Sequence, residues 1–287
     1  MPPLTISPIT ARRFIMGKQG LWPGRRFTGV DGTAAAIREM DALQLDPLIV
    51  IARSQDIAMY GRVLDYRIED IYTAAYERRE FFDYGGTLFF YPIEEVPYWR
   101  LHMKRRAEQE RWQQVYKDHP DTFKQVRDAL HANGPMANRD FKGNKKLEYS
   151  YRGGKDTSVV LYTLWLTGEV MIHHRIGFDR YYDLTENVLP SEFDYAAPEQ
   201  EAEDFFARKA VSFKGLMREK RWRANFASYI HRKVDLAEAK RRLAELFEQD
   251  VIAPVKIDGE KEPYIALKRD LPLLEELDAG RVPGTWQ

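Results

Sequence analysis

The middle of the chain carries the clearest alternation of apolar and polar positions. From Asp121, the stretch "DTFKQVRDALHANGP" spaces Phe123, Val126 and Leu130 as one face of a helix does. An Asp–Thr pair precedes this face and Gly134-Pro135 follows it, and these are ordinary start and stop signals. The pattern therefore predicts a helix here, and the following "MANRDF" has room for a second, short one.

The pattern continues as a third helix and then changes its period. In "DTSVVLYTLWLTGEV" the spacing turns Val160, Leu164 and Trp165 inward and leaves Gly168 near the end. The next stretch, "VMIHHRIGFDRYYDL", is rich in β-forming residues around Gly177-Phe178-Asp179, which predicts a hairpin. Three helices followed by a two-stranded hairpin are the plan of a winged helix, whose third helix can enter a DNA major groove.

The same plan returns toward the end of the sequence. The stretches "EDFFARKAVSFKGLM", "RANFASYI" and "DLAEAKRRLAELFEQD" are helical in pattern, and "VIAPVKIDGEKEPYIAL" predicts a hairpin that turns at Asp258-Gly259. Near the N-terminus, "ITARRFIMGKQGL" and "GTAAAIREMDAL" predict two more helices. The pattern thus predicts an α+β fold, mostly helical, with two winged helices in tandem.

Composition limits the size and chemistry of these modules. A chain of 287 residues that is 44% hydrophobic exceeds the usual single domain, so several small domains are expected. The absence of cysteine excludes disulfides, a thiolate nucleophile and cysteine-ligated metal, and it suits a reducing cytosol. "MPPLTISPITARRF" lacks the apolar core of a signal peptide, and no run is long enough to span a membrane. We expect a cytoplasmic protein that does not enter a membrane.

Charge is balanced over the whole chain but not along it. The 44 basic residues equal the 44 acidic ones, whereas residues 100–180 hold 16 Lys and Arg against 10 Asp and Glu. Residues 183–204 hold eight acidic residues and no Lys or Arg, so they should avoid phosphate. Neutralising DNA phosphates releases counterions, which favours binding, although a basic run is often only a solvated helix face. The candidate DNA contacts are Arg53, Arg100, Lys104, Arg105, Arg139, Lys142, Lys145, Lys146, Arg152, Lys155, His173, His174 and Arg175.

A short stretch near the N-terminus, "ALQLDPLIVIARS", puts Gln44 and Asp46 on either side of one leucine. In an extended chain two residues this far apart share a face, so the amide and the carboxylate would project together. The apolar positions that could then be buried are Leu45, Leu48, Val50 and Ala52. The structural alternative is that Asp46 is a cap that receives backbone N–H bonds before the turn at Pro47.

Several of these stretches together resemble a known family. "ARRFIMGKQGL", "IREMDALQLDPLIVIARS", "YYDLTENVLP" and the tandem winged helices are similar to the YcaQ/AlkZ family of bacterial DNA glycosylases. The resemblance implies three winged-helix modules around a concave, basic, DNA-binding surface, here over residues 1–117, 118–190 and 191–287. It also implies removal of bulky N7-alkylated purines, including crosslinked guanines. The Gln-x-Asp form of the motif resembles the YcaQ branch.

The resemblance gives Gln44 and Asp46 roles in glycosidic hydrolysis. An N7-alkylated guanine already carries positive charge and leaves without a general acid. An ionised Asp46 would stabilise the oxocarbenium-like sugar and direct water to its anomeric carbon, and Gln44 would hold the water or the carboxylate. The expected protein is a monomeric repair glycosylase acting on damaged double-stranded DNA, nucleoid-associated when bound.

Two departures from the family pattern affect the site and the ending. Family enzymes of this branch carry an "EYWAHEA"-like segment, whereas residues 82–92 read "FDYGGTLFFYP". Tyr84, Thr87 and Tyr91 could contact a lesion in its place, or the aromatic residues could simply pack in the core. The chain ends at "DAGRVPGTWQ", where family members continue into a C-terminal domain that we expect to be absent. Either a natural short form or an incomplete sequence would have this ending.

Metal and cofactor chemistry is not expected. His173 and His174 occupy adjacent positions of a predicted strand and should point to opposite faces, so they would not share an ion. Contact of this hairpin with DNA is their expected use. No "GxGxxG" or P-loop pattern is present, so no nucleotide cofactor is implied. The alternative from another class is a DNA-binding protein without catalysis, such as a transcriptional regulator, in which Asp46 is only a cap.

Overall fold

The computed structural model describes residues 3–141 and 155–282. It divides the chain into two compact units. Unit 1 comprises Met1–Leu43, Asp56–Arg67 and Pro198–Gln287, and unit 2 comprises Gln44–Gln55 and Ile68–Ala197. The segment with Gln44 and Asp46 is therefore part of unit 2, although the residues on both sides of it belong to unit 1.

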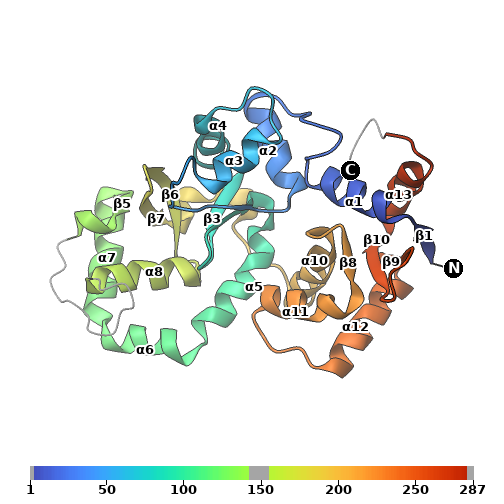
Figure 1. Cartoon of the computed structure of the whole chain (residues 1–287). Helices are drawn as coiled ribbons and strands as arrows, with labels where there is room; N and C mark the ends of the chain where they lie inside the picture. Colours follow the sequence, from blue (N-terminus) through green and yellow to red (C-terminus); the bar gives the residue numbers. More distant parts are fainter. Residues whose placement is uncertain (1–2, 142–154, 283–287) are drawn as a thin grey trace. The chain divides into compact units, whose positions relative to one another are not determined.

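Unit 1 joins the two ends of the sequence in one sheet. Its strands are β1 (Leu4–Ile6), β8 (Leu216–Arg218), β9 (Ile252–Ile257) and β10 (Tyr264–Leu267), in the spatial order β1-β9-β10-β8. Its helices include α1 (Pro8–Lys18), α2 (Gly29–Glu39), α10 (Glu199–Ser212), α11 (Glu219–Ile230), α12 (Leu236–Glu248) and α13 (Leu271–Asp278). Figure 1 shows β1 beside β9 and α13 beside α1, which brings the first and last elements together.

The pairing of β1 with β9 was not predicted. It is parallel, with Leu4 opposite Val255, and it buries Ile6 in a core with Phe14 and Leu274. A strand of three residues between prolines has too little pattern to be recognised alone. Its partner lies far away in the sequence, so only tertiary packing can specify it.

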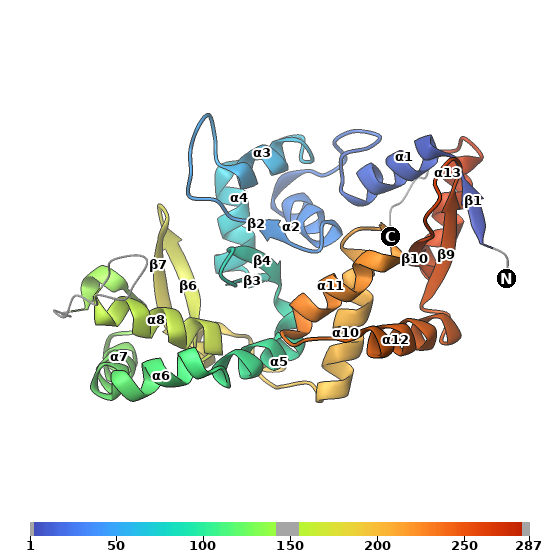
Figure 2. The same ribbon diagram turned by 60° about the horizontal axis from the view of Figure 1, so that its bottom comes forward.

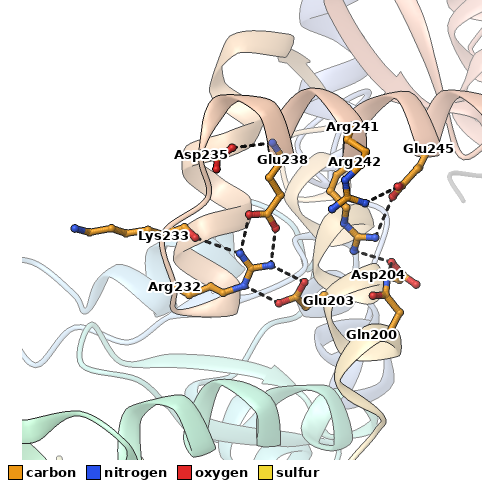
Figure 3. A network of polar contacts seen from close by, with 10 residues as sticks. All are labelled: Gln200, Glu203, Asp204, Arg232, Lys233, Asp235, Glu238, Arg241, Arg242 and Glu245. Atoms are coloured by element: carbon orange, nitrogen blue, oxygen red, sulfur yellow. Dashed lines mark hydrogen bonds and ion pairs between the residues drawn. The ribbon is translucent and has the colours of Figure 1, made fainter.

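Arginines tie α10 to α12 within unit 1 (Figure 3). Arg232 donates to Glu203 on α10 at 2.9 Å and to Glu238 on α12 at 2.5 and 2.9 Å. Arg242 donates to Asp204 at 2.7 Å and to Glu245 at 3.2 Å. Two of the acidic residues in 183–204 are thus neutralised by arginines of the protein itself.

The described residues of unit 2 form two small sheets with helices around them. One sheet has the order β2-β4-β3, with β2 (Leu43–Gln44), whose first residue belongs to unit 1, β3 (Phe81–Tyr84) and β4 (Phe89–Pro92). The other has the order β5-β7-β6, with β5 (Met136–Ala137), β6 (Val170–Ile176) and β7 (Asp179–Leu184). The helices are α4 (Ile68–Tyr72), α5 (Val96–Ala107), α6 (Glu110–Asp118), α7 (Pro120–Asn133), α8 (Asp156–Thr167) and α9 (Thr185–Val188). The helix α3 (Ser54–Tyr60) crosses from unit 2 into unit 1.

One strand order occurs three times in the part of the chain that the structure describes. In β2-β4-β3, β5-β7-β6 and β8-β10-β9, a short first strand pairs with the last strand of the hairpin that follows it. The overall architecture is mixed α+β, as expected, with helices predominating in the part of the chain that the structure describes.

The predicted elements of the middle segment are largely confirmed. α7, α8 and the hairpin β6–β7 lie where the pattern put them, and Val160, Leu164 and Trp165 are buried. Figure 2 shows the hairpin next to α8. The helix expected in "MANRDF" was wrong: the chain makes strand β5 and a single 3-10 turn, Asn138–Asp140. The Asp140 carboxylate accepts the Ala137 N–H at 2.8 Å and closes that turn.

No helix in the described ranges is long and apolar enough to cross a membrane.

Candidate active site

The site is built on the segment 44–55 of unit 2. Gln44 ends β2 and its side chain is exposed, whereas the next residue, Leu45, is only 3% exposed. The Leu45 N–H donates to the Leu88 carbonyl at 2.8 Å, which extends the contact with the β3–β4 hairpin by one residue. Asp46 follows, partly exposed, at the point where the regular strand has ended.

The Asp46 carboxylate turns the chain away from the sheet. Its Oδ1 accepts the Leu48 N–H at 2.9 Å across Pro47, the local turn that short acidic side chains favour. The capping contact considered for this residue is therefore present. It occupies one oxygen, and no hydrogen bond to Oδ2 is found among the described residues. Because Asp46 is partly exposed, its second oxygen remains for other chemistry.

Gln55 holds the other side of Asp46 and was missed by the sequence analysis. Its Oε1 accepts the Asp46 backbone N–H at 3.0 Å, and the residue is only 1% exposed. This bond fixes the orientation of the amide and leaves Nε2 buried, without a partner in the part of the chain that the structure describes. Leaving such a donor unpaired costs about 1–3 kcal/mol, so natural proteins rarely do it without a reason. No local signal reveals this contact, because it joins the turn at Asp46 to the start of helix α3, nine residues away.

The apolar residues beyond Asp46 were wrongly expected to be buried. Leu48 is 73% exposed and Val50 is 92% exposed, and their neighbours Ile49 and Ile51 are 63% and 93% exposed. The turn at Asp46 ends the strand, so no ladder remains to fix an alternation of buried and exposed positions. Residues 45–53 have no helix or strand and form the loop between β2 and α3 in Figure 2.

Arg53 anchors the far end of this loop. Its Nη1 lies 3.4 Å from the Tyr72 hydroxyl, and its guanidinium lies 5.3 Å from the centre of the Phe178 ring. Its Nε is buried without a hydrogen-bond partner among the residues described. Arg53, a candidate DNA contact, thus lies on unit 2 at the base of the exposed loop.

Arg175, another candidate, is inside the protein. Its side chain is 1% exposed, and its Nε donates to Asp83 at 2.8 Å and to the Tyr76 hydroxyl at 3.1 Å. Burial and Asp83 raise the pKa of Tyr76 far above its usual range. Burial alone would lower the pKa of Arg175, but Asp83 and Tyr76 raise it more. The structure gives Arg175 an internal partner instead of a surface position.

The β6–β7 hairpin brings His173 and His174 together. Their Nδ1 atoms are 2.9 Å apart, so the expectation that they point to opposite faces was wrong. The register shifts between Ile172 and His174, and this bulge breaks the alternation on which the expectation rested. Burial and the nearby charge of Arg79 lower the pKa of both histidines below 6.5, which favours neutral rings near pH 7. No group of three His, Asp or Glu side chains suited to a metal occurs in the described ranges.

The remaining basic candidates differ in how they are used. Arg100 donates to the Gly168 carbonyl at 3.1 Å and to Asp194 at 2.7 Å, within unit 2. Arg139 is 57% exposed on its side chain, forms an ion pair with Asp179 and bonds to the Tyr181 hydroxyl. Lys104 and Lys155 are exposed and Arg105 is partly buried. Four candidates lie outside the described residues: Lys142, Lys145, Lys146 and Arg152.

Two of the three lesion-site candidates pack in the core. Tyr84 is 1% exposed and donates its hydroxyl proton to the Leu166 carbonyl at 2.7 Å, and Tyr91 is 9% exposed. Their rings lie 5.7 and 4.3 Å from that of Trp99, and burial raises the pKa of both tyrosines. Thr87 is exposed in the turn between β3 and β4. The packing alternative therefore describes both tyrosines.

A cavity of about 360 Å³ elsewhere in unit 2 is lined by Arg100, Arg127 and Glu169 among other residues. Arg127 donates to Glu169 at 2.7 and 3.0 Å, and Arg100 is held by Asp194. Because the two arginines are already neutralised, the cavity offers less to an anion than its residue types suggest.

Comparisons with known proteins bear on both the family and the fold. A family model described as "DNA glycosylase AlkZ-like" matches residues 37–285, which include all of segment 44–55. Among solved structures, the DNA glycosylase AlkZ of Streptomyces sahachiroi matches with a TM-score of 0.64 at 13% sequence identity. The match covers 98% of this chain and 74% of that one, and at this identity it shows a shared fold.

Proposed function

The chain belongs to the AlkZ-like family of DNA glycosylases, hydrolases of N-glycosyl bonds, and from this we propose that it excises N7-alkylated purines from duplex DNA. The observation that carries the proposal is the Asp46 carboxylate. It stands on the segment after β2 with one oxygen fixed by the Leu48 N–H and the side chain partly open to solvent.

The proposed reaction needs one carboxylate and one water. The C1′–N9 bond breaks and its electron pair goes to the cationic base, which leaves as a neutral purine without a general acid. Positive charge then develops on the sugar, where an ionised Asp46 stabilises it. Water adds to C1′, and the carboxylate orients it and takes up its proton.

Gln44 is the proposed partner of Asp46. Its exposed side chain on β2 carries both a donor and an acceptor, and these can hold the attacking water or the carboxylate. Gln55 fixes the Asp46 backbone from the other side. A guanine crosslinked through N7 also carries a positive charge, so the same reaction would release it.

We propose that the chain folds as three winged-helix modules, over residues 1–117, 118–190 and 191–287, which present a basic surface to DNA. The threefold repetition of one strand order supports this division. The proposed phosphate contacts among the described residues are the solvent-accessible cations Lys104, Arg105, Arg139 and Lys155, with Arg53 next to the loop. The substrate would be damaged double-stranded DNA bound by a monomer.

A non-catalytic DNA-binding role is the second candidate. It is favoured by one observation, the bond from the Leu48 N–H to Asp46 Oδ1, which would suffice for a purely structural carboxylate. A regulator of this kind would bind a preferred undamaged sequence and release no base.

The test is base release from a duplex that carries a single N7-methylguanine, followed by chromatography of the free base. The proposal predicts release by the native chain and none from the undamaged duplex. An N3-methyladenine duplex tests whether the preference extends to another cationic purine. Tight binding without any released base would instead favour the regulator.

A further inference from the structure

We propose that residues 48–51 form an apolar wedge that enters the base stack of duplex DNA beside the nucleotide attacked at Asp46. The inference rests on the proposed function, because it takes the substrate to be duplex DNA. The sequence wrongly suggested that this apolar loop is buried, and the proposed partner of its exposed side chains is DNA.

The wedge residues are exposed to an extent that soluble proteins seldom tolerate in a row. Leu48, Ile49, Val50 and Ile51 are consecutive and between 63% and 93% exposed. Single exposed apolar residues are common on protein surfaces, but a contiguous set usually marks a surface that binds something. No helix or strand holds these side chains against the rest of unit 2.

The base of the loop is anchored while its tip is free. On the entry side, Leu45 bonds to Leu88, and the Asp46 N–H donates to Gln55 at 3.0 Å. On the exit side, the Arg53 guanidinium contacts the Tyr72 hydroxyl and the Phe178 ring. These contacts fix where the apolar tip begins and ends, so insertion need not order the entire segment.

The chemistry of the loop selects bases over phosphates. From Pro47 to Ala52 no residue carries a charge, and none has a side-chain hydrogen-bond donor or acceptor. Such a tip gains nothing from the sugar–phosphate backbone. Leu, Ile and similar side chains instead insert between base steps of DNA-bending proteins and partly unstack them. Arg53, at the end of the loop, is the cation next to this surface.

The wedge is also coupled directly to Asp46. The N–H of Leu48, the first wedge residue, donates to Asp46 Oδ1 at 2.9 Å. Insertion of the wedge would therefore define the position of the carboxylate relative to the distorted nucleotide. An unstacked step also opens the sugar to the attacking water without requiring a pocket that encloses the base.

The test replaces the apolar tip and keeps the anchors. The wedge variant is Ile49→Ser/Val50→Ser/Ile51→Ser. The matched control is Ile9→Ser/Leu64→Ser/Leu236→Ser, which removes three apolar side chains that are 52%, 56% and 54% exposed in unit 1. The wedge variant should unfold at the temperature of the native chain, because its substituted residues are at least 63% exposed. The control, whose residues are about half buried, should be no more stable than the wedge variant.

The first measurement is the fluorescence of 2-aminopurine placed next to the lesion in a duplex. The native chain and the control should raise it on binding, as expected when a base is unstacked, and the wedge variant should not. Single-turnover base release should fall about 30-fold or more in the wedge variant, with the control within about threefold of the native chain. Ile51→Leu, which keeps the apolar character, should retain release.

Equal fluorescence and release for the wedge variant and the control would overturn the proposal. The fluorescence change does not need catalysis. If the native chain binds DNA and releases no base, the proposed function fails, while the fluorescence still decides whether the loop inserts. An unchanged 2-aminopurine signal with the native chain bound would also overturn the wedge.

Discussion

Two groups of polar residues in this protein differ in how completely their side chains are paired. In unit 1, Arg232 meets two carboxylates on α10 and α12 with four hydrogen bonds of 2.5–2.9 Å (Figure 3). In unit 2, the segment 44–55 buries the Gln55 Nε2 without a partner and exposes four apolar side chains beside Asp46. Selection for stability alone would favour paired side chains such as that of Arg232. It would not favour a buried unpaired amide or a run of exposed apolar side chains.

The difference supports the proposal that segment 44–55 contacts the substrate. Buried donors without partners and exposed apolar runs both cost free energy in the isolated protein, and they are common where a ligand completes the surface. Unit 2 does not lack the means to pair charges, as the buried Asp83–Arg175 contact shows. Buried side-chain atoms without a hydrogen-bond partner also occur elsewhere among the described residues of both units, including Arg242 Nε and Asp83 Oδ1. The feature that sets segment 44–55 apart is therefore the exposed apolar run beside Asp46.

The largest expected effect is the loss of stability when the buried Asp83–Arg175 ion pair of unit 2 is broken. Asp83→Ala leaves the Arg175 guanidinium buried without its carboxylate and should lower the free energy of unfolding by about 3–5 kcal/mol. The control is Asp179→Ala, which breaks the solvent-exposed pair with Arg139 and should cost far less. Urea denaturation measures both, and equal losses would contradict the assignment of Arg175 to an internal role.

The next effect separates stability from activity at Gln55. Gln55→Leu should slow base release by about 10- to 100-fold, because Asp46 loses the acceptor that holds its N–H. The free energy of unfolding should change by less than about 1 kcal/mol, since the same substitution removes a buried, unpaired donor. Gln55→Met is the matched unbranched control and should behave like the leucine variant. Large destabilisation with normal release by the folded fraction would make Gln55 purely structural.

In unit 1 we expect the reverse, a substitution that lowers stability and leaves the rate of base release unchanged. Arg232→Met should lower the free energy of unfolding by about 1 kcal/mol, a modest value because a third of this side chain is exposed. Base release should not change. Arg241→Met, which loses one ion pair at a more exposed position, should have a smaller effect. Slower release by the folded Arg232 variant would show that the network is not only structural.

The smallest effect concerns pH. The pKa values of His173 and His174 are lowered in the fold by burial and by Arg79, so between those values and about 6.5 the unfolded chain binds more protons. Their contribution to stability is complete above about pH 6.5 and is lost as the pH falls through that window. The double variant His173→Asn/His174→Asn should flatten the dependence of the melting temperature between pH 7 and 5.5. An unchanged slope would contradict the shift.

The sequence pattern predicted helices and hairpins whose signal lies within one short stretch of the chain. The helical face of Phe123, Val126 and Leu130 is buried as expected, and the hairpin turns at Gly177. The β1–β9 pairing escaped prediction because three residues carry no periodic signal and their partners lie at the other end of the sequence. The bulge that joins His173 to His174 escaped it because a register shift depends on the opposing strand.

The candidate residues of the site could be selected from the sequence, but the exposure of the adjoining loop and the contact with Gln55 could not. Gln44 and Asp46 were selected by their spacing and by resemblance, and their roles remain predictions. Alternation suggested that Leu48 and Val50 were buried, but the side chain of Asp46 ends the strand before them. Gln55 could not be found from the sequence, since its contact with Asp46 depends on how the intervening loop closes.

The most direct test of the central claim is the single-turnover rate of N7-methylguanine release by the native chain and by Asp46→Asn. The variant preserves the size of the side chain and the Oδ1 acceptor for Leu48, and it removes the charge. A catalytic carboxylate predicts a loss of at least about a hundredfold in rate, with unchanged thermal unfolding and DNA binding. Release by Asp46→Asn at the native rate would contradict the account and leave Asp46 as the cap of a turn.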